Sequence, residues 1–111
     1  MGMFLAKDGA QQAGFVKLID LLRNGEGRAW VKLTGTYRMA TLPALTDAAP
    51  MARALIAAAP DRLIWGSDYP HLSFADKVGS VQLFNLLADW APDEATRRRI
   101  LVDNPAALFG F

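Results

Sequence analysis

Residues 62–68, Arg-Leu-Ile-Trp-Gly-Ser-Asp, form a compact apolar run that ends in a carboxylate. A similar run, Ala-Trp-Val-Lys-Leu, occupies residues 29–33 and is followed by Thr34-Gly35. Both runs are too short for a stable helix and contain residues that favour strands, so each is predicted to be a β-strand. Their almost continuous apolar character indicates strands covered on both faces, as in a parallel sheet.

One helix is predicted before the first strand, and another is predicted between the two strands. Between residues 11 and 24, apolar residues recur at i, i+3, i+4 and i+7, which predicts an amphipathic helix. A second helix is expected over residues 47–59, with Asp47 as its N-cap. Because this helix joins the two strands, the strands should lie parallel and adjacent, connected by a right-handed crossover.

Two more helices are expected in the C-terminal part of the chain. One covers residues 80–90, and another covers residues 92–102 and is predicted to end at Asn104-Pro105. The apolar tail, residues 106–111, is expected to dock onto the domain. Residues 1–111 should therefore form one α/β domain in the order helix, strand, helix, strand, helix, helix. The apolar side of the third helix is predicted to consist of Val81, Phe84 and Leu87.

The composition excludes several classes of protein. The 111 residues carry 12 Lys and Arg against 11 Asp and Glu, a net charge of +1, without the basic excess of a nucleic-acid binder. Hydrophobic residues make up 52%, which is too much for intrinsic disorder. No run of about 18 apolar residues indicates a membrane span, and the N-terminus lacks a secretory pattern. The absence of Cys excludes disulfides and Cys-ligated zinc, and it fits a cytoplasmic protein.

Asp68 is the main candidate for catalysis. It ends the second predicted strand, and this end is where α/β barrels and open parallel sheets bind their ligands. Strand alternation places it on the same face as Ile64 and Gly66. His71, the only His of the chain, follows three residues later. A carboxylate here could act as a general base toward water. The alternative is structural: Asp68 caps a loop or the next helix, and His71 is a solvated loop residue.

Basic residues near the strand ends are candidates for substrate binding. Arg38 follows the first strand, so it would lie at the same end of the sheet as Asp68. Its planar guanidinium would suit a carboxylate-bearing substrate. The alternative is a surface Arg without a partner. Lys32 could point inward near the same end of the sheet. The alternative is a partly buried Lys that is paired with a neighbouring carboxylate. The run Arg97–Arg99 indicates a solvated helix face, because adjacent helical residues point in different directions.

Three motifs resemble the end of a (β/α)8 barrel, or TIM barrel, of the metal-dependent hydrolase type. They occupy residues 31–38 (Val-Lys-Leu-Thr-Gly-Thr-Tyr-Arg), 60–71 (Pro-Asp-Arg-Leu-Ile-Trp-Gly-Ser-Asp-Tyr-Pro-His) and 100–111 (Ile-Leu-Val-Asp-Asn-Pro-Ala-Ala-Leu-Phe-Gly-Phe). Their order and spacing are similar to those of the amidohydrolase-related family, and within it to the 2-pyrone-4,6-dicarboxylate lactonase branch. The resemblance covers nearly the whole chain but only the C-terminal portion of the barrel, so the strands would be the seventh and eighth.

This resemblance implies a hydrolase that opens a lactone, or a similar carboxylated small molecule, by water attack. In the family, the Asp that closes the last strand acts as base or proton shuttle, a role that falls on Asp68. The resemblance places a carboxylate clamp on Arg38 and a substrate contact on His71, with Thr34 where Ser is usual. No cofactor is predicted for this chain. In metal-using relatives, a divalent metal such as zinc would be held in the intact barrel, and Asp68 could be one of its ligands.

The departures from the family pattern leave two alternatives open. The His-x-His motif of the first strand is absent, and a complete barrel takes roughly 250 residues. The alternatives are a metal-dependent decarboxylase of the same barrel family, and a catalytically silent chain that serves as an assembly module. Alone, the chain is expected to be inactive and to self-associate through unpaired strand edges. A small-molecule substrate is the expected ligand, with no nucleic acid and no membrane as partner.

Overall fold

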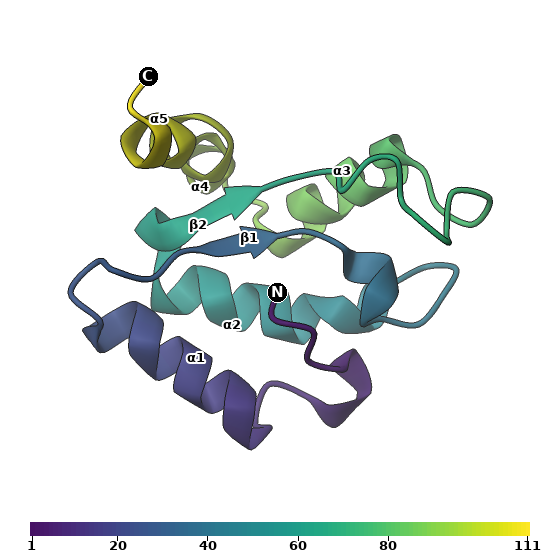
Figure 1. The fold of residues 1–111 in the computed structure, drawn as a ribbon, viewed down its shortest axis with the longest axis horizontal. Coiled ribbons are helices and arrows are strands. Elements are labelled where there is room, and N and C mark those ends of the chain that lie inside the picture. The colour runs from purple at the N-terminus through teal and green to yellow at the C-terminus, as the bar shows by residue number, and fades with distance from the viewer.

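The computed structural model describes residues 1–111 and contains the predicted order of elements (Figure 1). The N-terminal part consists of α1 (Ala13–Asn24), β1 (Val31–Leu33), α2 (Ala49–Ala58) and β2 (Leu63–Trp65). The C-terminal part consists of α3 (Ser80–Trp90), α4 (Glu94–Arg98), a π-helical turn (Arg99–Asp103) and α5 (Asn104–Phe109). None of these helices has the length and apolar character that a membrane span requires. The α/β class predicted from the sequence is confirmed.

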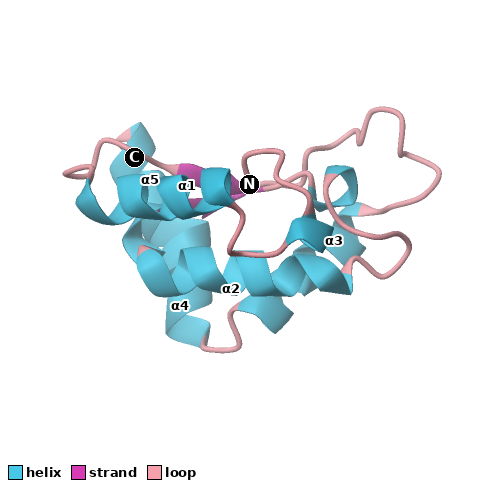
Figure 2. Cartoon of the chain, turned by 90° about the horizontal axis from the view of Figure 1, so that it is seen from below, coloured by secondary structure: helices cyan, strands magenta, loops and turns pink.

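The two strands form a parallel sheet, as the strand–helix–strand pattern predicts. Lys32 of β1 is paired with Ile64 of β2, and the pairs on either side are Val31 with Leu63 and Leu33 with Trp65. Leu33 and Leu63 are fully buried, whereas Lys32 is exposed. Figure 2 shows α2 and α4 on one side of the strands, with no helix covering the other side. The expectation of strands covered on both faces is therefore wrong for this chain.

The core lies between the covered face of the sheet and the helices. The predicted stripe of α1 is confirmed, because Phe15 and Leu22 are buried while Leu18 and Ile19 pack against the core. The other large side chains at the centre of the core are Leu33, Leu45, Met51, Leu55, Leu63, Leu87 and Ile100.

The predicted apolar side of α3 is wrong in two of its three residues. Val81 is 74% exposed and Phe84 is 47% exposed, while Leu87 is buried. The buried positions start two residues later and follow the i, i+3, i+4, i+7 spacing, which presents four large side chains to the core. Phe84 instead lies at the surface, where its ring packs edge-on against Trp65 with 5.3 Å between the ring centroids. The four buried residues are Leu83, Leu86, Leu87 and Trp90.

Asp47 does not cap α2, contrary to the sequence prediction. Its carboxylate accepts hydrogen bonds from the backbone N–H of Thr41 at 2.8 Å and from the Thr41 hydroxyl at 2.6 Å. These bonds hold the pKa of Asp47 below its ordinary value. The helix begins at Ala49, and Pro50 in its first turn has no N–H that would need a cap. Asp47 therefore closes the preceding loop rather than the helix.

Asn104-Pro105 does not end the last helical region, which was the sequence expectation. The chain continues without a break through the π-helical turn into α5, with Asp103 and Asn104 in helical backbone conformation and Pro105 in the first turn of α5. Asn104 is 5% exposed, and its side-chain amide donates to the carbonyl oxygens of Pro60 at 2.8 Å and Leu63 at 2.7 Å. The C-terminal helical region is thus tied to the beginning of β2.

The chain terminus does not dock as expected. Phe109 and Phe111 are 61% and 84% exposed, and their rings stack on each other with centroids 6.1 Å apart.

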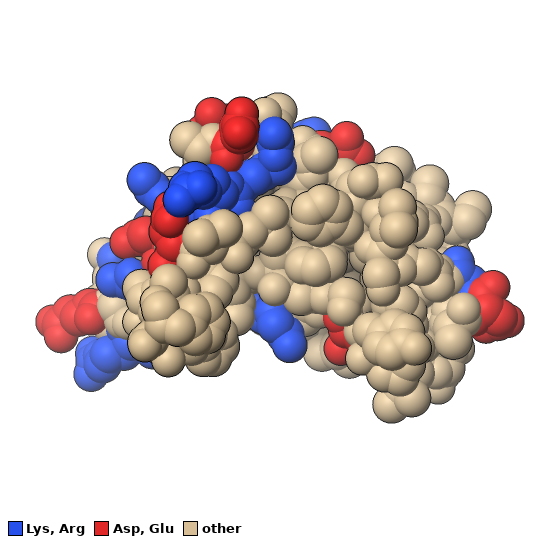
Figure 3. Space-filling view, turned by 90° about the horizontal axis from the view of Figure 1, so that it is seen from above, with Lys and Arg blue, Asp and Glu red and all other residues tan.

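Figure 3 shows Lys and Arg interspersed with Asp and Glu toward one end of the molecule, beside a broad uncharged surface. The nearly neutral sequence therefore produces no large patch of one sign on this face.

Asn104→Ala is expected to lower the free energy of unfolding by about 2–4 kcal/mol, because it removes a buried donor from two carbonyl oxygens. Urea unfolding followed by circular dichroism measures the change. Asn24→Ala is the matched control: this Asn lies on the surface and bonds only Asp20 at 2.6 Å, so its loss should cost less than about 0.5 kcal/mol. Equal losses for the two variants would show that Asn104 does not fasten α5.

Candidate active site

The C-terminal ends of β1 and β2 bring Arg38 and Asp68 together. After β1, Gly35 adopts a left-handed conformation (φ 62°), and a 3₁₀ turn over Thr36–Arg38 follows. A side chain at Gly35 would be strained, and its Cβ would lie 3.5 Å from Oδ2 of Asp68. Arg38 Nε lies 3.6 Å from the same Oδ2. The arrangement follows from the parallel sheet, because both strands end at the same edge.

Tyr37 is a site residue that the sequence analysis did not single out. Its side chain is buried, and its hydroxyl donates to Oδ2 of Asp68 at 2.5 Å. The ring packs against Phe74 at 5.0 Å and against His71 at 5.8 Å between centroids. The available signal was its place in the motif of residues 31–38, directly before Arg38. Aromatic residues at such positions are more commonly part of the core, and Tyr37 is both core residue and hydrogen-bond donor.

The surroundings of Asp68 stabilise its charged form. The hydrogen bond from Tyr37 is the largest cause that lowers its pKa, and the positive charge of Arg38 adds to it, against a smaller opposing effect of burial. Burial and the bond to Asp68 in turn raise the pKa of Tyr37. Near neutral pH, Asp68 is therefore a carboxylate and Tyr37 a neutral phenol. A carboxylate in this state can accept a proton, although a lowered pKa makes it a weaker base than an ordinary Asp.

His71 lies in the loop after β2, but its ring is inside the protein. The residue is only 4% exposed, and Nε2 lies 3.3 Å from the Ser80 hydroxyl. Its backbone N–H donates to the carbonyl oxygen of Asp68 at 2.8 Å. The alternative of a solvated His71 is therefore wrong, and its ring supports that of Tyr37. Contact between His71 and a substrate stays a prediction.

A cavity of about 260 Å³ opens beside the Arg38–Asp68 pair. Thr34 lies in its wall and donates its hydroxyl proton to the carbonyl oxygen of Gly66 at 2.9 Å, which links the segments that follow β1 and β2 just beyond the paired strands. The cavity is lined by Met1, Gly2, Met3, Thr34, Gly35, Arg38, Met39 and Asp68. A small molecule in this cavity would therefore meet both the carboxylate and the guanidinium.

The other basic residues have less direct roles. Lys32 is exposed on the uncovered face of the sheet and has no carboxylate within salt-bridge distance, so the alternative of a buried, paired Lys is wrong. Its charge contributes slightly to the lowered pKa of Asp68. In the run Arg97–Arg99, Arg97 donates to the carbonyl oxygens of Ala91 at 2.7 Å and Pro92 at 2.8 Å. Arg97 thus binds backbone carbonyl oxygens next to its own helix, which is not the arrangement of an anion site.

The residues of this chain do not by themselves fit a metal ion. A catalytic zinc site typically has about three protein ligands, and the chain contains no cluster of three His, Cys, Asp or Glu side chains. At the strand ends, Asp68 has Oδ2 engaged by Tyr37, and the His71 ring is buried against Ser80.

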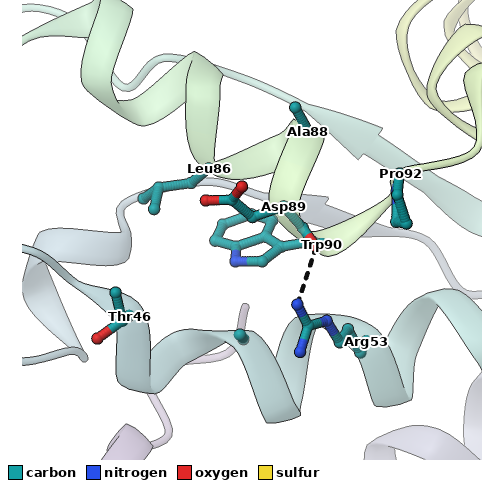
Figure 4. A pocket seen from close by; sticks show the side chains of 8 residues that line it. Thr46, Arg53, Leu86, Ala88, Asp89, Trp90 and Pro92 are labelled. Carbon is teal, nitrogen blue, oxygen red and sulfur yellow. Dashed lines mark hydrogen bonds between the residues drawn. The ribbon is translucent and has the colours of Figure 1, made fainter.

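The largest cavity of the chain, about 520 Å³, lies away from Asp68, between α2 and α3. Figure 4 shows Arg53 of α2 reaching across to α3, where it donates to the backbone oxygen of Asp89 at 3.0 Å. The indole of Trp90 forms part of the wall. Thr46 and Asp89 line this cavity, but Arg38 and Asp68 line the smaller cavity at the strand ends, which is therefore the candidate active site.

The structure thus brings an ionised Asp and an Arg together at the C-terminal ends of two parallel strands. The family model described as amidohydrolase matches residues 1–111, so the chain belongs to the amidohydrolase family. The family resemblance that the three sequence motifs indicated is therefore confirmed.

The chain is similar to lactone-processing enzymes of known name. It is 48% identical over 106 residues to the 4-sulfomuconolactone hydrolase of Hydrogenophaga intermedia, which covers 92% of this chain and 34% of that enzyme. It is 38% identical over 106 residues to the D-galactarolactone isomerase of Agrobacterium fabrum, covering 92% of this chain and 35% of that enzyme. The chain thus spans about a third of the length of these relatives.

Solved structures show the same likeness. A candidate 2-pyrone-4,6-dicarboxylic acid hydrolase from Pseudomonas putida superposes with a TM-score of 0.84 and 33% identity, over 98% of this chain and 40% of that one. A candidate hydrolase of the same name from Acinetobacter baumannii, with citric acid bound, gives a TM-score of 0.81 and 26% identity, over 99% of this chain and 41% of that one.

Proposed function

We propose that these residues form the seventh and eighth strands, with their helices, of a TIM-barrel lactonase that opens a lactone bearing an acidic substituent. The observation that carries the proposal is the Arg38–Asp68 pair beside a cavity at the C-terminal ends of parallel strands. The names of the relatives support the substrate class, since sulfomuconolactone and pyrone dicarboxylate are both rings with anionic groups. The citric acid bound to the Acinetobacter structure is a further polycarboxylate.

The proposed chemistry is hydrolysis of the ring ester. Asp68 takes a proton from water while the water oxygen forms a bond to the ester carbonyl carbon. The bond between that carbon and the ring oxygen then breaks, and the ring oxygen receives the proton, so that one water is consumed per ring opened. His71 is proposed to contact the substrate or its leaving group. This assignment rests on the family resemblance.

Arg38 is proposed to hold the acidic substituent. Its Nη2 donates to the carbonyl oxygen of Leu72 at 3.2 Å, and its Nε faces Asp68, so the guanidinium is held in place while other N–H groups remain for a ligand. The guanidinium also packs over the rings of Tyr37 and Phe74. A planar group fixed in this manner suits a carboxylate or sulfonate better than a flexible Lys would.

The activity can be tested in a chimera in which this sequence replaces the matching region of the Hydrogenophaga hydrolase. Arg38→Met should raise the KM for a carboxylated lactone about 10- to 100-fold and change the KM for an uncharged lactone much less, because only the charged ring loses its partner. Arg28→Met is the control, since that side chain is exposed, lies 3.9 Å from Glu26 and donates to the carbonyl oxygen of Gly25 at 3.1 Å, away from the cavity. Equal effects on charged and uncharged lactones would remove Arg38 from substrate binding.

A lactone isomerase is the second candidate function, and the similarity to D-galactarolactone isomerase favours it. Product analysis in water enriched with heavy oxygen separates the two reactions. Hydrolysis adds one solvent oxygen to the product, whereas isomerisation leaves the mass unchanged. We expect the incorporation of solvent oxygen with the carboxylated lactone.

A further inference from the structure

We propose that Tyr37 is the positioning residue of Asp68: together with Arg38 it fixes Oδ2, which leaves Oδ1 as the oxygen that takes the proton from water. The inference rests on the proposed function, because it assigns parts to the two oxygens of the proposed base. It adds a residue whose hydroxyl need not touch the substrate.

The structure gives both fixed contacts to the same oxygen atom. The Tyr37 hydroxyl donates to Oδ2 at 2.5 Å, and Arg38 Nε lies 3.6 Å from Oδ2. No group of the chain forms a hydrogen bond to Oδ1. A carboxylate anchored through one oxygen keeps lone pairs on the other that are free for water. Anchoring thus separates the structural oxygen from the reactive one.

Tyr37 itself is held rigidly enough to act as an anchor. It lies in the 3₁₀ turn directly after Gly35, its residue exposure is 2%, and its ring is enclosed by Phe74 and His71. The His71 ring is in turn held at the Ser80 hydroxyl, 3.3 Å from Nε2. A series of side-chain contacts therefore extends from the N-terminus of α3 to the reactive carboxylate, in the order Ser80, His71, Tyr37 and Asp68.

The backbone of Asp68 explains why an anchor is needed. Its φ of 58° lies in the left-handed region, which is costly for a residue with a side chain and persists only where the surroundings enforce it. The bond from Tyr37 and the backbone bond from His71 to the Asp68 carbonyl oxygen, 2.8 Å long, supply that enforcement. Without the Tyr37 hydroxyl, the side chain is free to rotate toward Arg38 or solvent.

Tyr37→Phe has two opposing effects that make the proposal testable. Loss of the hydroxyl should raise the pKa of Asp68 toward its ordinary value, which makes it a stronger base. Loss of the anchor should misplace the carboxylate, and a misplacement of about 1 Å can cost about 100-fold in rate. If Tyr37 positions Asp68, kcat falls although the base is stronger. If Tyr37 only lowers the pKa of Asp68, kcat is unchanged or rises.

Two measurements are made on matched variants. Carbon-13 NMR of the labelled chimera follows the Asp68 carboxyl group from pH 2 to pH 7, with Arg38 and Lys32 as the other charges near it. Steady-state kinetics of the chimera give kcat and KM with a carboxylated lactone. Tyr69→Phe is the control, because the same hydroxyl is lost from a neighbouring, 78% exposed residue that does not bond Asp68.

We expect Tyr37→Phe to raise the carboxyl pKa and to lower kcat about 10- to 100-fold with less than a threefold change in KM, while Tyr69→Phe leaves the Asp68 carboxyl pKa unchanged. An unchanged or increased kcat in Tyr37→Phe, with Asp68→Asn inactive, would overturn the positioning role and leave the proposed function intact. Near-normal turnover of Asp68→Asn would instead overturn the proposed function, whatever the behaviour of Tyr37→Phe.

Discussion

Asp68→Asn should lower the kcat of the chimera about 100- to 10,000-fold, the range that one positioned general base contributes. The Asn side chain has nearly the same shape, and its carbonyl oxygen can still accept the hydrogen bond that Tyr37 donates to Oδ2 of the Asp. It cannot take a proton from water. The substitution therefore removes the base while it keeps the contact that fixes the side chain. Steady-state kinetics with a carboxylated lactone measure the loss.

The control for this experiment is Asp76→Asn, which makes the same chemical change on the same segment between β2 and α3, at an exposed position. Its turnover should stay within twofold of the unsubstituted chimera. Urea unfolding of both variants checks that the fold is retained. Turnover of Asp68→Asn within about tenfold of the unsubstituted protein would exclude Asp68 as the base.

The second large effect concerns the 111-residue chain by itself, which is expected to show no lactonase activity and to self-associate. Its sheet has two strands, so each strand has one unpaired edge, and such edges pair readily with other chains. One face of the sheet has no helix over it (Figure 2), and the surface includes the stacked Phe109 and Phe111. The related hydrolase is about three times as long, and this chain covers only 34% of it.

Size-exclusion chromatography with light scattering measures the mass of the chain at several concentrations, alongside a lactonase assay on the same fractions. We expect species larger than the 12.1 kDa monomer, with a share that grows with concentration. Lys residues substituted onto the exposed aromatic tail, Phe109→Lys and Phe111→Lys, should reduce association if the tail contributes more than the strand edges. A monomer that hydrolyses the lactone would contradict the expectation.

The elements that could be predicted from the sequence are those in which local pattern and burial agree. In α1, Phe15 and Leu22 follow the helical period and are buried, and the two strands lie parallel because a helix connects them. The position of Asp68 beside Arg38 follows from the same topology. In α3, two apolar stripes compete, and only the packing shows that the stripe from Leu83 to Trp90 faces the core.

The residues that could not be predicted depend on contacts between distant parts of the chain. Asp47 precedes a helix and has the chemistry of an N-cap, but Thr41 offers its carboxylate two donors in the folded loop. Tyr37 meets Asp68 across 31 positions of sequence, and no periodic pattern carries that information. His71 lies in a loop rich in turns, and its burial follows from the rings of Tyr37 and Tyr69 around it.

The π-helical turn at Arg99–Asp103 limits how the length of this sequence can change over evolution. A π-helical turn contains one residue more than an α-helical turn, and each residue of a helix rotates the next side chain by about 100°. Deletion of one residue would restore a regular helix but turn Asn104 away from the carbonyl oxygens of Pro60 and Leu63. Insertions and deletions should therefore be rare within residues 99–103, and should collect at the exposed residues 75–77, where no such contact depends on the number of residues.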